Sequence, residues 1–278
     1  MRLGGPLFAD ASDPERWIAA LRQRGYSAAY CPIDNTATDE VIRAYAEAAR
    51  KADIVLAEVG AWSNPLSADE ASRRAALAHC QAQLALADRI GARCCVNIAG
   101  SRGAQWDGPH PDNLTEATFD LIVESVRAII DAVKPTRAYY TLETMPWMYP
   151  DSPESYLRLI RAVDRRQFAV HLDPVNLICS PQLFYANGDL LRECFAKLGP
   201  YIQCCHAKDI TLSGKLTVHL DETRPGLGAL DYGVFLQELD KLDPDTPLLL
   251  EHLSTEEDYT QAAEYVRSVA QQVGVMIR

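Results

Sequence analysis

The alternation of strand-like and helix-like segments constrains the fold of this chain more than any other feature. Eight short apolar runs are separated by longer segments with helical periodicity. The runs begin near residues 2, 26, 53, 93, 138, 168, 201 and 247. Nearly continuous apolar strands that alternate with helices are typical of parallel strands covered by helices. Eight such units in 278 residues predict an α/β fold, a single-domain (β/α)₈ barrel over residues 1–278.

An open, doubly wound sheet is the main alternative for such an alternating chain. That fold commonly carries a GxGxxG turn after its first strand, whereas this chain has only "GGP" at Gly4. Several helical segments open on a Ser, Thr or Asp cap, and two of them close on glycine. No linker or low-complexity segment divides the chain. The barrel is therefore favoured, and it places a functional site where strands end and the following loops begin.

Composition limits the partners that such a barrel could bind. The net charge of −11 offers no basic surface for a phosphate backbone, so we expect neither nucleic acid nor an anionic membrane as the main partner. A small neutral substrate or a cation fits the charge better. The first residues lack the basic and apolar regions of a signal peptide, and no apolar run is long enough to cross a membrane. We expect a cytoplasmic protein.

The cysteines do not suggest a disulfide framework or a thiolate metal site. The chain has eight of them, and pairs such as Cys94-Cys95 and Cys204-Cys205 stand inside apolar, strand-like runs. No CxxC pair is present. We expect free, buried thiols.

Four successive predicted strands each end on a side chain that can bind a metal ion. Strand five ends at Glu143, strand six at Asp173, strand seven at His206 and strand eight at Glu251. Each residue alone is more often a cap, a salt-bridge partner or a core histidine. Together, three carboxylates and an imidazole at one end of a barrel predict a site for one divalent ion. Such a donor set suits Mn²⁺ first, with Mg²⁺, Co²⁺ and Zn²⁺ also compatible.

These motifs resemble those of the xylose isomerase-like TIM barrels, a superfamily of sugar and sugar-phosphate isomerases and epimerases that includes the ketose 3-epimerases. The resemblance lies in "LET", "HLDPVN", "HAKD", "PGLGALDYGVF" and "LLLEHL". It implies a metal-dependent isomerase or epimerase in which Glu143 and Glu251 also move protons. The implied reaction removes a proton next to a carbonyl and passes through a metal-stabilised enediolate.

One position departs from the ketose 3-epimerases. Asn176 stands where those enzymes carry a substrate-binding histidine, three residues after the aspartate. An asparagine can still hydrogen-bond a sugar hydroxyl, so Asn176 remains a candidate substrate contact. The departure weakens the analogy with the 3-epimerases in particular.

Further candidate substrate contacts follow from spacing and from loop position. His171 and Lys208 lie two residues from Asp173 and His206, so each shares the face of a predicted ligand. Trp62, Asn97 and Trp147 follow the ends of strands three, four and five, where aromatic side chains can cover a sugar ring.

The resemblance adds one more residue, because the family often places a substrate-binding arginine in the loop after strand seven. Arg224 occupies that loop here. No glycine-rich phosphate cradle stands out, which favours an unphosphorylated sugar. Members of the family are often homodimers or homotetramers.

Other functions remain open at this level. A lyase or dehydratase acting on a keto sugar or an inosose would use the same four side chains, and it would expel a leaving group instead of returning the proton. A metal-dependent nuclease of the endonuclease IV type shares the fold but needs more histidines and a less acidic surface. A barrel that only binds sugar would not need two glutamates on one ion.

Overall fold

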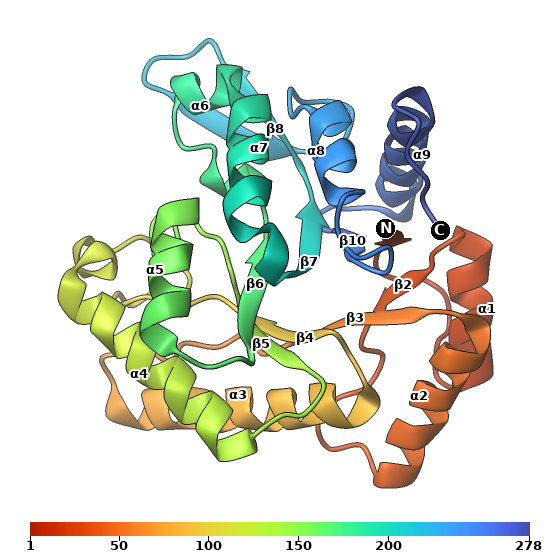
Figure 1. The fold of residues 1–278 in the computed structure, drawn as a ribbon, viewed down its shortest axis with the longest axis horizontal. Coiled ribbons are helices and arrows are strands. Elements are labelled where there is room, and N and C mark those ends of the chain that lie inside the picture. Colours follow the sequence, from red (N-terminus) through yellow and green to blue (C-terminus); the bar gives the residue numbers. More distant parts are fainter.

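The computed structural model describes residues 1–278 and contains the predicted barrel (Figure 1). Eight parallel strands pair in the order β1-β10-β7-β6-β5-β4-β3-β2. The backbone N–H of Ser27 donates to the carbonyl of Leu3 at 2.9 Å and links the first and last strands of this order, which nearly closes the sheet. The barrel strands are β1 (Arg2–Gly4), β2 (Ala28–Tyr30), β3 (Val55–Gly60), β4 (Cys94–Asn97), β5 (Tyr139–Glu143), β6 (Phe168–Leu172), β7 (Ile202–Ala207) and β10 (Pro247–Leu250).

Helices surround the strands as an outer layer (Figure 1). Each of the main helices follows a strand and returns the chain to the other end of the barrel. They are α1 (Pro14–Arg24), α2 (Asp39–Ala52), α3 (Glu70–Ile90), α4 (Glu116–Val133), α5 (Pro153–Val163), α6 (Pro181–Tyr185), α7 (Asn187–Leu198), α8 (Tyr232–Leu239) and α9 (Glu256–Gln272). Short 3₁₀ turns stand at η1 (Pro111–Leu114), η2 (Val175–Leu177) and η3 (Gly199–Tyr201).

The helix boundaries follow the predicted capping residues. The carboxylate of Asp13 accepts from the backbone N–H groups of Glu15 and Arg16 at the start of α1. Gly25 ends that helix with φ of 64°, a conformation that glycine adopts without steric cost. Local sequence and tertiary fold therefore agree at this boundary.

One element was not expected from the sequence. The segment after β7 forms an antiparallel hairpin of β8 (Asp209–Ser213) and β9 (His219–Thr223), where only a loop was anticipated. The first strand, "DITLS", alternates polar and apolar residues, but the second, "HLDET", has only one apolar residue, so the pattern gives no clear hairpin signal. The hairpin lies beside the end of the barrel where the strands finish, so it can shape a site there (Figure 1).

The core has a large part between sheet and helices and a small part inside the barrel. The small part joins Ala28, Ala57, Cys94, Cys204 and Leu249, which come from five different barrel strands. All eight cysteines are free. Six of them are buried, as predicted, whereas Cys31 is half-buried and Cys179 is exposed. No helix combines the length and the apolar composition needed to cross a bilayer.

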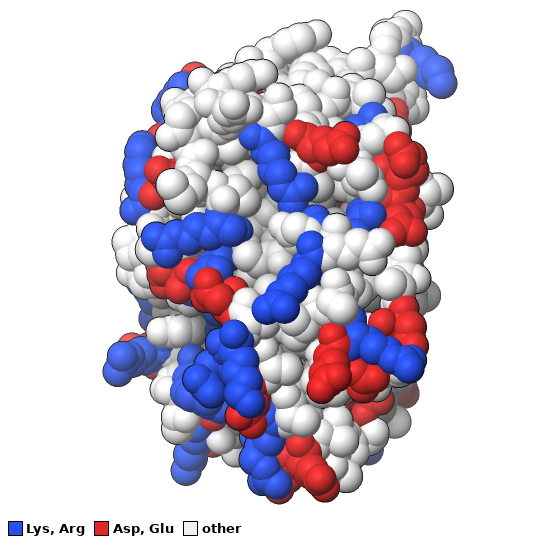
Figure 2. Space-filling model, turned by 90° about the vertical axis from the view of Figure 1, so that its right-hand side faces the viewer, with Lys and Arg blue, Asp and Glu red and all other residues white.

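Positive and negative side chains are interspersed on the face over α1, α2 and α9 (Figure 2). Several form ion pairs, such as Arg24 with Glu256 and Lys51 with Glu47. Exposed pairs of this kind contribute little to stability. This face therefore presents no continuous basic surface of the type that a phosphate backbone requires.

Candidate metal-binding and active site

The structure brings the four predicted ligand residues together at one end of the barrel. Glu143 is the last residue of β5, Asp173 follows β6, His206 lies in β7, and Glu251 follows β10. One ligand atom from each residue lies within 4.8 Å of the others. Asp173 and His206 are fully buried, and the two glutamates are nearly so.

Local hydrogen bonds fix the position of Asp173. Its backbone N–H donates to the hydroxyl of Thr144 at 3.0 Å, and that hydroxyl donates to the carbonyl of Asp173 at 2.7 Å. Carboxylate oxygen Oδ1 accepts from the backbone N–H of Val175 at 3.0 Å, in the turn that Pro174 begins. The other oxygen, Oδ2, is left facing the centre of the site.

Asn176 holds Glu143 from the next loop. Its Nδ2 donates to Glu143 Oε1 at 3.0 Å and to the carbonyl of Thr144 at 3.1 Å. One oxygen of Glu143 is thus oriented by the residue that departs from the 3-epimerase pattern. Asn176 also lines the pocket above the site, where its carbonyl oxygen can meet a ligand.

Lys208 has far more acidic partners than the sequence suggested. Its buried ammonium lies 2.8 Å from Asp173 Oδ2 and 2.7 Å from Glu251 Oε1. Glu222 of the hairpin stands 3.5 Å away and Glu143 3.8 Å away. These carboxylates come from four separate segments, so only the folded barrel reveals the cluster. Lys208 supplies one positive charge to a group of acidic side chains that would otherwise repel one another.

Burial and this crowding shift the ionisation of the four side chains. Burial raises the pKa of Asp173 to about 7, with Lys208 opposing the rise and the two glutamates adding to it. For His206, burial acts to lower the pKa, but Glu251, Glu143 and Glu58 together raise it well above its ordinary value. The carboxylates therefore favour a positive charge at His206 Nδ1, which a divalent ion can supply in place of a proton.

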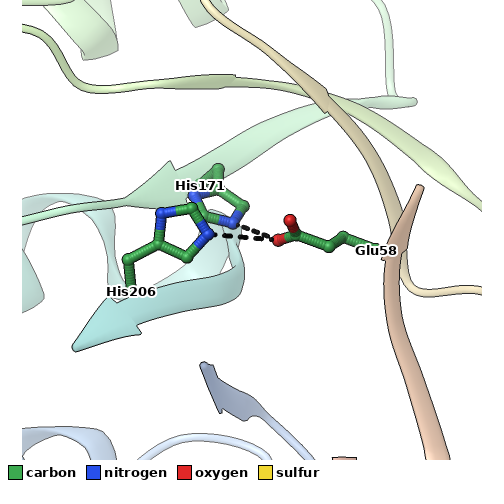
Figure 3. A group of neighbouring side chains, drawn as sticks. All are labelled: Glu58, His171 and His206. Carbon is green, nitrogen blue, oxygen red and sulfur yellow. Dashed lines mark hydrogen bonds and ion pairs between the residues drawn. The ribbon is translucent and has the colours of Figure 1, made fainter. Parts of the chain in front are cut away.

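A further carboxylate, which sequence reasoning missed, lies behind His206 (Figure 3). Glu58 extends from β3 and is 1% exposed. Its Oε2 is 2.6 Å from Nε2 of His171 and 3.4 Å from Nε2 of His206. Burial would raise the pKa of Glu58, but the two imidazoles lower it to about 2. Glu58 is therefore ionised; it hydrogen-bonds His171 and forms a longer ion pair with His206.

His171, in β6, and Asp173, just after it, therefore have different surroundings although they are only two residues apart. His171 is buried one layer deeper, where it contacts Glu58 and packs edge-on against the ring of His206, 4.1 Å between centroids. The only sequence signal for Glu58 was a charged residue within the apolar run "VLAEVG". A buried acid of this kind needs a partner, which is a reason to look for one.

A pocket of about 450 Å³ opens above the four side chains. Two of the four, Glu143 and Glu251, line it, together with Lys208 and Asn176. Trp62 and Trp147 form part of its wall, as anticipated from their loops. Trp147 is held by its indole N–H, which donates to the carbonyl of Asp107 at 2.8 Å. A polar floor beneath aromatic walls is suited to a sugar ring.

Three predicted substrate contacts do not reach this pocket. His171 lies below it, as described. Asn97 is fully buried and holds the loop after β3, since its amide bonds the backbone N–H and carbonyl of Ser63 at 3.2 Å each. Arg224 lies outside the pocket, with Nε 3.7 Å from Asp258. In this structure none of the three is placed to touch a ligand beside Glu143.

Two residues outside the predicted contacts also line the pocket. They are His252 and Glu222, and Nδ1 of His252 lies 3.2 Å from a carboxylate oxygen of Glu222. The backbone of His252 has φ of 57°, which turns the chain sharply after Glu251. The turn and the hairpin together bring this pair to the rim.

The site fits a divalent ion by its chemistry. Asp173 Oδ2, His206 Nδ1 and Glu251 Oε1 are buried and make no hydrogen bond, although Lys208 forms ion pairs with the two carboxylates. Oxygen donors with one imidazole match the preferences of Mn²⁺, Mg²⁺ and Co²⁺. Glu58 on the far side of His206 is the kind of partner that orients metal-binding histidines.

Fold and site together define a single-domain (β/α)₈ barrel with an acidic, metal-competent centre at the carboxyl ends of its strands. A sequence profile described as xylose isomerase-like TIM barrel matches residues 18–269. The chain therefore belongs to the xylose isomerase-like TIM barrel family. A search of curated protein sequences finds no match.

Solved structures with the same fold are distant in sequence. D-Psicose 3-epimerase from Clostridium cellulolyticum H10, solved with D-tagatose, is 14% identical with a TM-score of 0.70, over 99% of this chain and 100% of that one. A probable 3-DHS dehydratase, AsbF from Bacillus anthracis, is 15% identical with a TM-score of 0.68, over 96% and 98%. A xylose isomerase-like TIM barrel protein from Mycobacterium smegmatis, solved with magnesium, is 18% identical with a TM-score of 0.65, over 94% and 90%. At these identities the likeness establishes the fold.

Proposed function

We propose that this protein is a divalent-metal-dependent enzyme that isomerises or epimerises a keto sugar. The observation that carries the proposal is that Glu143 and Glu251 belong both to the four-residue ligand group and to the pocket wall. Asp173 and His206 belong to the ligand group alone. Two carboxylates that face both an ion and a bound molecule are placed to move protons.

The proposed reaction begins with removal of a proton from the carbon next to the carbonyl. An ion held by Glu143, Asp173, His206 and Glu251 would polarise that carbonyl and so make the proton more acidic. One glutamate removes the proton, and the other returns a proton to the opposite face or to the neighbouring carbon. Return to the opposite face gives an epimer, and return to the neighbouring carbon gives an isomer.

The surrounding residues support this assignment of roles. Asn176 keeps one oxygen of Glu143 in a fixed orientation by donating to it. Trp62, Trp147 and Met145 form a partly apolar wall around the acidic floor, which limits the water that can reach the reacting carbon.

Elimination is the second candidate, and Lys208 favours it. Its ammonium reaches the pocket and lies 2.7 Å from Glu251. A cation there can stabilise the negative charge that develops on a hydroxyl as it leaves the carbon beyond the carbanion, which would give a dehydratase acting on a keto sugar or an inosose. The nuclease alternative has less support, because His171 bonds Glu58 below the pocket and does not face a ligand.

A deuterium-exchange assay tests the proposal. The protein is incubated in D₂O and Mn²⁺ with a panel of ketoses, 3-keto sugars and inososes, and each recovered sugar is analysed by NMR and mass spectrometry. We expect deuterium next to the carbonyl in one class of sugar, and loss of exchange with EDTA. A product of unchanged skeleton indicates isomerisation or epimerisation, whereas loss of one water indicates elimination. Absence of exchange with every sugar would refute the proposal.

A further inference from the structure

A second groove lies beside the pocket of the candidate active site. It has a volume of about 870 Å³ and runs between the loop after β3 and the loop after β4, over the start of α3. Trp62 and Trp106 line both the groove and the pocket. The two indoles thus form a wall shared by the groove and the pocket, so one extended ligand could occupy both.

Both indoles leave much of their surface free. Trp62 is 44% exposed and Trp106 is 37% exposed, so each ring offers an open apolar surface beside the pocket. Trp62 lies against the backbone of its own strand, since a Cβ on Gly60 would stand 2.4 Å from its Nε1. The position of the ring therefore depends on a glycine.

The polar lining of the groove suits hydroxyl groups better than a charged ligand. It consists of donors and acceptors in near balance: Ser63, Asn64, Ser67, Asp69, Ser72, His79 and Arg102. Its one permanent cation, Arg102, is engaged by the carbonyl of Leu66. Asp69 accepts from the backbone N–H of Ser72 at 2.8 Å as the cap of α3. No cluster of free cations is left for a phosphate.

The walls of the groove are fixed to one another in the folded chain. Asn64 Nδ2 donates to the carbonyl of Ser101 at 2.8 Å and so joins the two loops. Gly100 makes room for this contact, because its φ is 98° and a Cβ there would stand 2.2 Å from Asn64 Oδ1. Asn97 holds Ser63 from below. A groove held in this way binds without a large cost of ordering its loops.

We propose that this groove binds the part of the substrate that lies beyond the reacting sugar, namely a second sugar ring. The inference rests on the proposed function. It narrows that function, because the preferred substrate is a keto disaccharide and not a free keto monosaccharide. The reacting ring occupies the pocket over Glu143 and Glu251. The second ring packs on Trp62 and Trp106 and hydrogen-bonds the polar residues of the groove.

Filling the groove from its far wall tests the inference. Ala75 is an exposed residue of α3 that lines the groove, whereas Ala78 is exposed on the same helix and lies off it. The test variant is Ala75→Trp and the matched control is Ala78→Trp. Ser72→Tyr, also exposed and in the groove, is a second test variant in case the first folds poorly. Circular dichroism and thermal unfolding verify the fold of each.

Deuterium exchange is measured with 3-keto-maltose and with 3-keto-glucose. We expect kcat/KM for the keto disaccharide to exceed that for the keto monosaccharide by about tenfold or more in the parent protein. Ala75→Trp should remove this advantage and leave the monosaccharide within about twofold, and Ala78→Trp should change neither. Equal rates for the two sugars in the parent, or equal effects of Ala75→Trp on both, would overturn the inference.

Binding of unreactive sugars separates this inference from the proposed chemistry. Maltose and glucose are titrated while the tryptophan fluorescence is recorded. Tighter binding of maltose that Ala75→Trp abolishes supports the groove, even if no sugar exchanges deuterium and the proposed reaction fails. Equal binding of maltose and glucose, or maltose binding that Ala75→Trp leaves unchanged, contradicts it.

Discussion

Glu58 Oε2 lies 3.4 Å from Nε2 of His206, while Nδ1 on the other side of the same ring lies 2.9 Å from Glu251. The ring therefore stands between a deep carboxylate from β3 and the ligand group at the end of the barrel. An ionised Glu58 keeps a proton on Nε2 and leaves Nδ1 for an ion.

We predict that Glu58→Gln weakens the binding of Mn²⁺ by about 10- to 100-fold. The negative charge of Glu58 orients the imidazole of His206 and increases its basicity, and the substitution removes that charge. Isothermal titration with Mn²⁺ measures this effect directly. Glu264→Gln, on an exposed position of α9, is the control and should bind Mn²⁺ as the parent does. An unchanged affinity for Mn²⁺ in Glu58→Gln would mean that the contact between Glu58 and His206 does not contribute to metal binding.

The two glutamates at the pocket should be individually essential for proton transfer. Glu143→Gln and Glu251→Gln preserve size and keep one acceptor oxygen, but they remove the negative charge and the basic oxygen. We expect each to lower the rate of deuterium exchange by about 10²- to 10⁴-fold, the usual contribution of a general acid or base. Full exchange activity in both variants, with the sugar that the parent accepts, would show that other groups move the proton.

Lys208 and a divalent ion should act on the same carboxylates. Lys208→Met leaves Asp173 and Glu251 without their nearest positive charge, which we expect to destabilise the metal-free protein by about 3–5 kcal/mol. Mn²⁺ should then raise the unfolding temperature of Lys208→Met more than that of the parent. Lys215→Met, exposed on the hairpin, serves as control. Equal Mn²⁺-induced shifts in the parent and in Lys208→Met would argue against shared carboxylates.

Asp88 provides a pH-dependent contribution to stability away from the site. Its Oδ1 accepts from the backbone N–H groups of Thr136, Arg137 and Ala138, which fixes the segment that leads into β5. Burial would raise the pKa of Asp88, but these hydrogen bonds lower it. A carboxylate whose pKa is lower in the folded than in the unfolded protein stabilises the folded state. This stabilisation is complete at pH values above the unfolded pKa of about 3.9, and it is lost as the pH falls through the folded pKa.

Asp88→Asn should therefore lower the free energy of unfolding by about 1–2 kcal/mol at pH 7, and the difference from the parent should shrink as the pH falls below about 4. Urea unfolding at a series of pH values measures it. Asp120→Asn, on the exposed side of α4, should show no such dependence. A constant difference at every pH would mean that the charge of Asp88 is not what stabilises the fold.

The sequence predicts the barrel and its four candidate ligand residues because both follow from local patterns. Alternating strands and helices define the topology, and Asp173 or Glu251 is recognisable as a polar residue at the end of an apolar run. The partners of Lys208 could not be predicted in this way, since they come from four segments that meet only in the closed barrel.

Glu58 was missed for a related reason. It lies inside a strand, not at its end, and it is 113 residues from His171 in the chain. Asn176 shows the opposite case, because its position was noted from sequence but its bond to Glu143 depends on the geometry of the turn after Asp173. Contacts between distant strands can thus be predicted only when the fold is known, whereas the polar residues at strand ends can be recognised in the sequence.

We propose that Glu143, Asp173, His206 and Glu251 hold one divalent ion. A crystal structure of the protein grown with Mn²⁺, with diffraction data collected near the manganese absorption edge, tests it most directly. We predict a single strong anomalous peak within coordination distance of all four side chains, with the ammonium of Lys208 displaced from between Asp173 and Glu251. The absence of such a peak, or a peak bound elsewhere while Lys208 still joins these carboxylates, would contradict the claim.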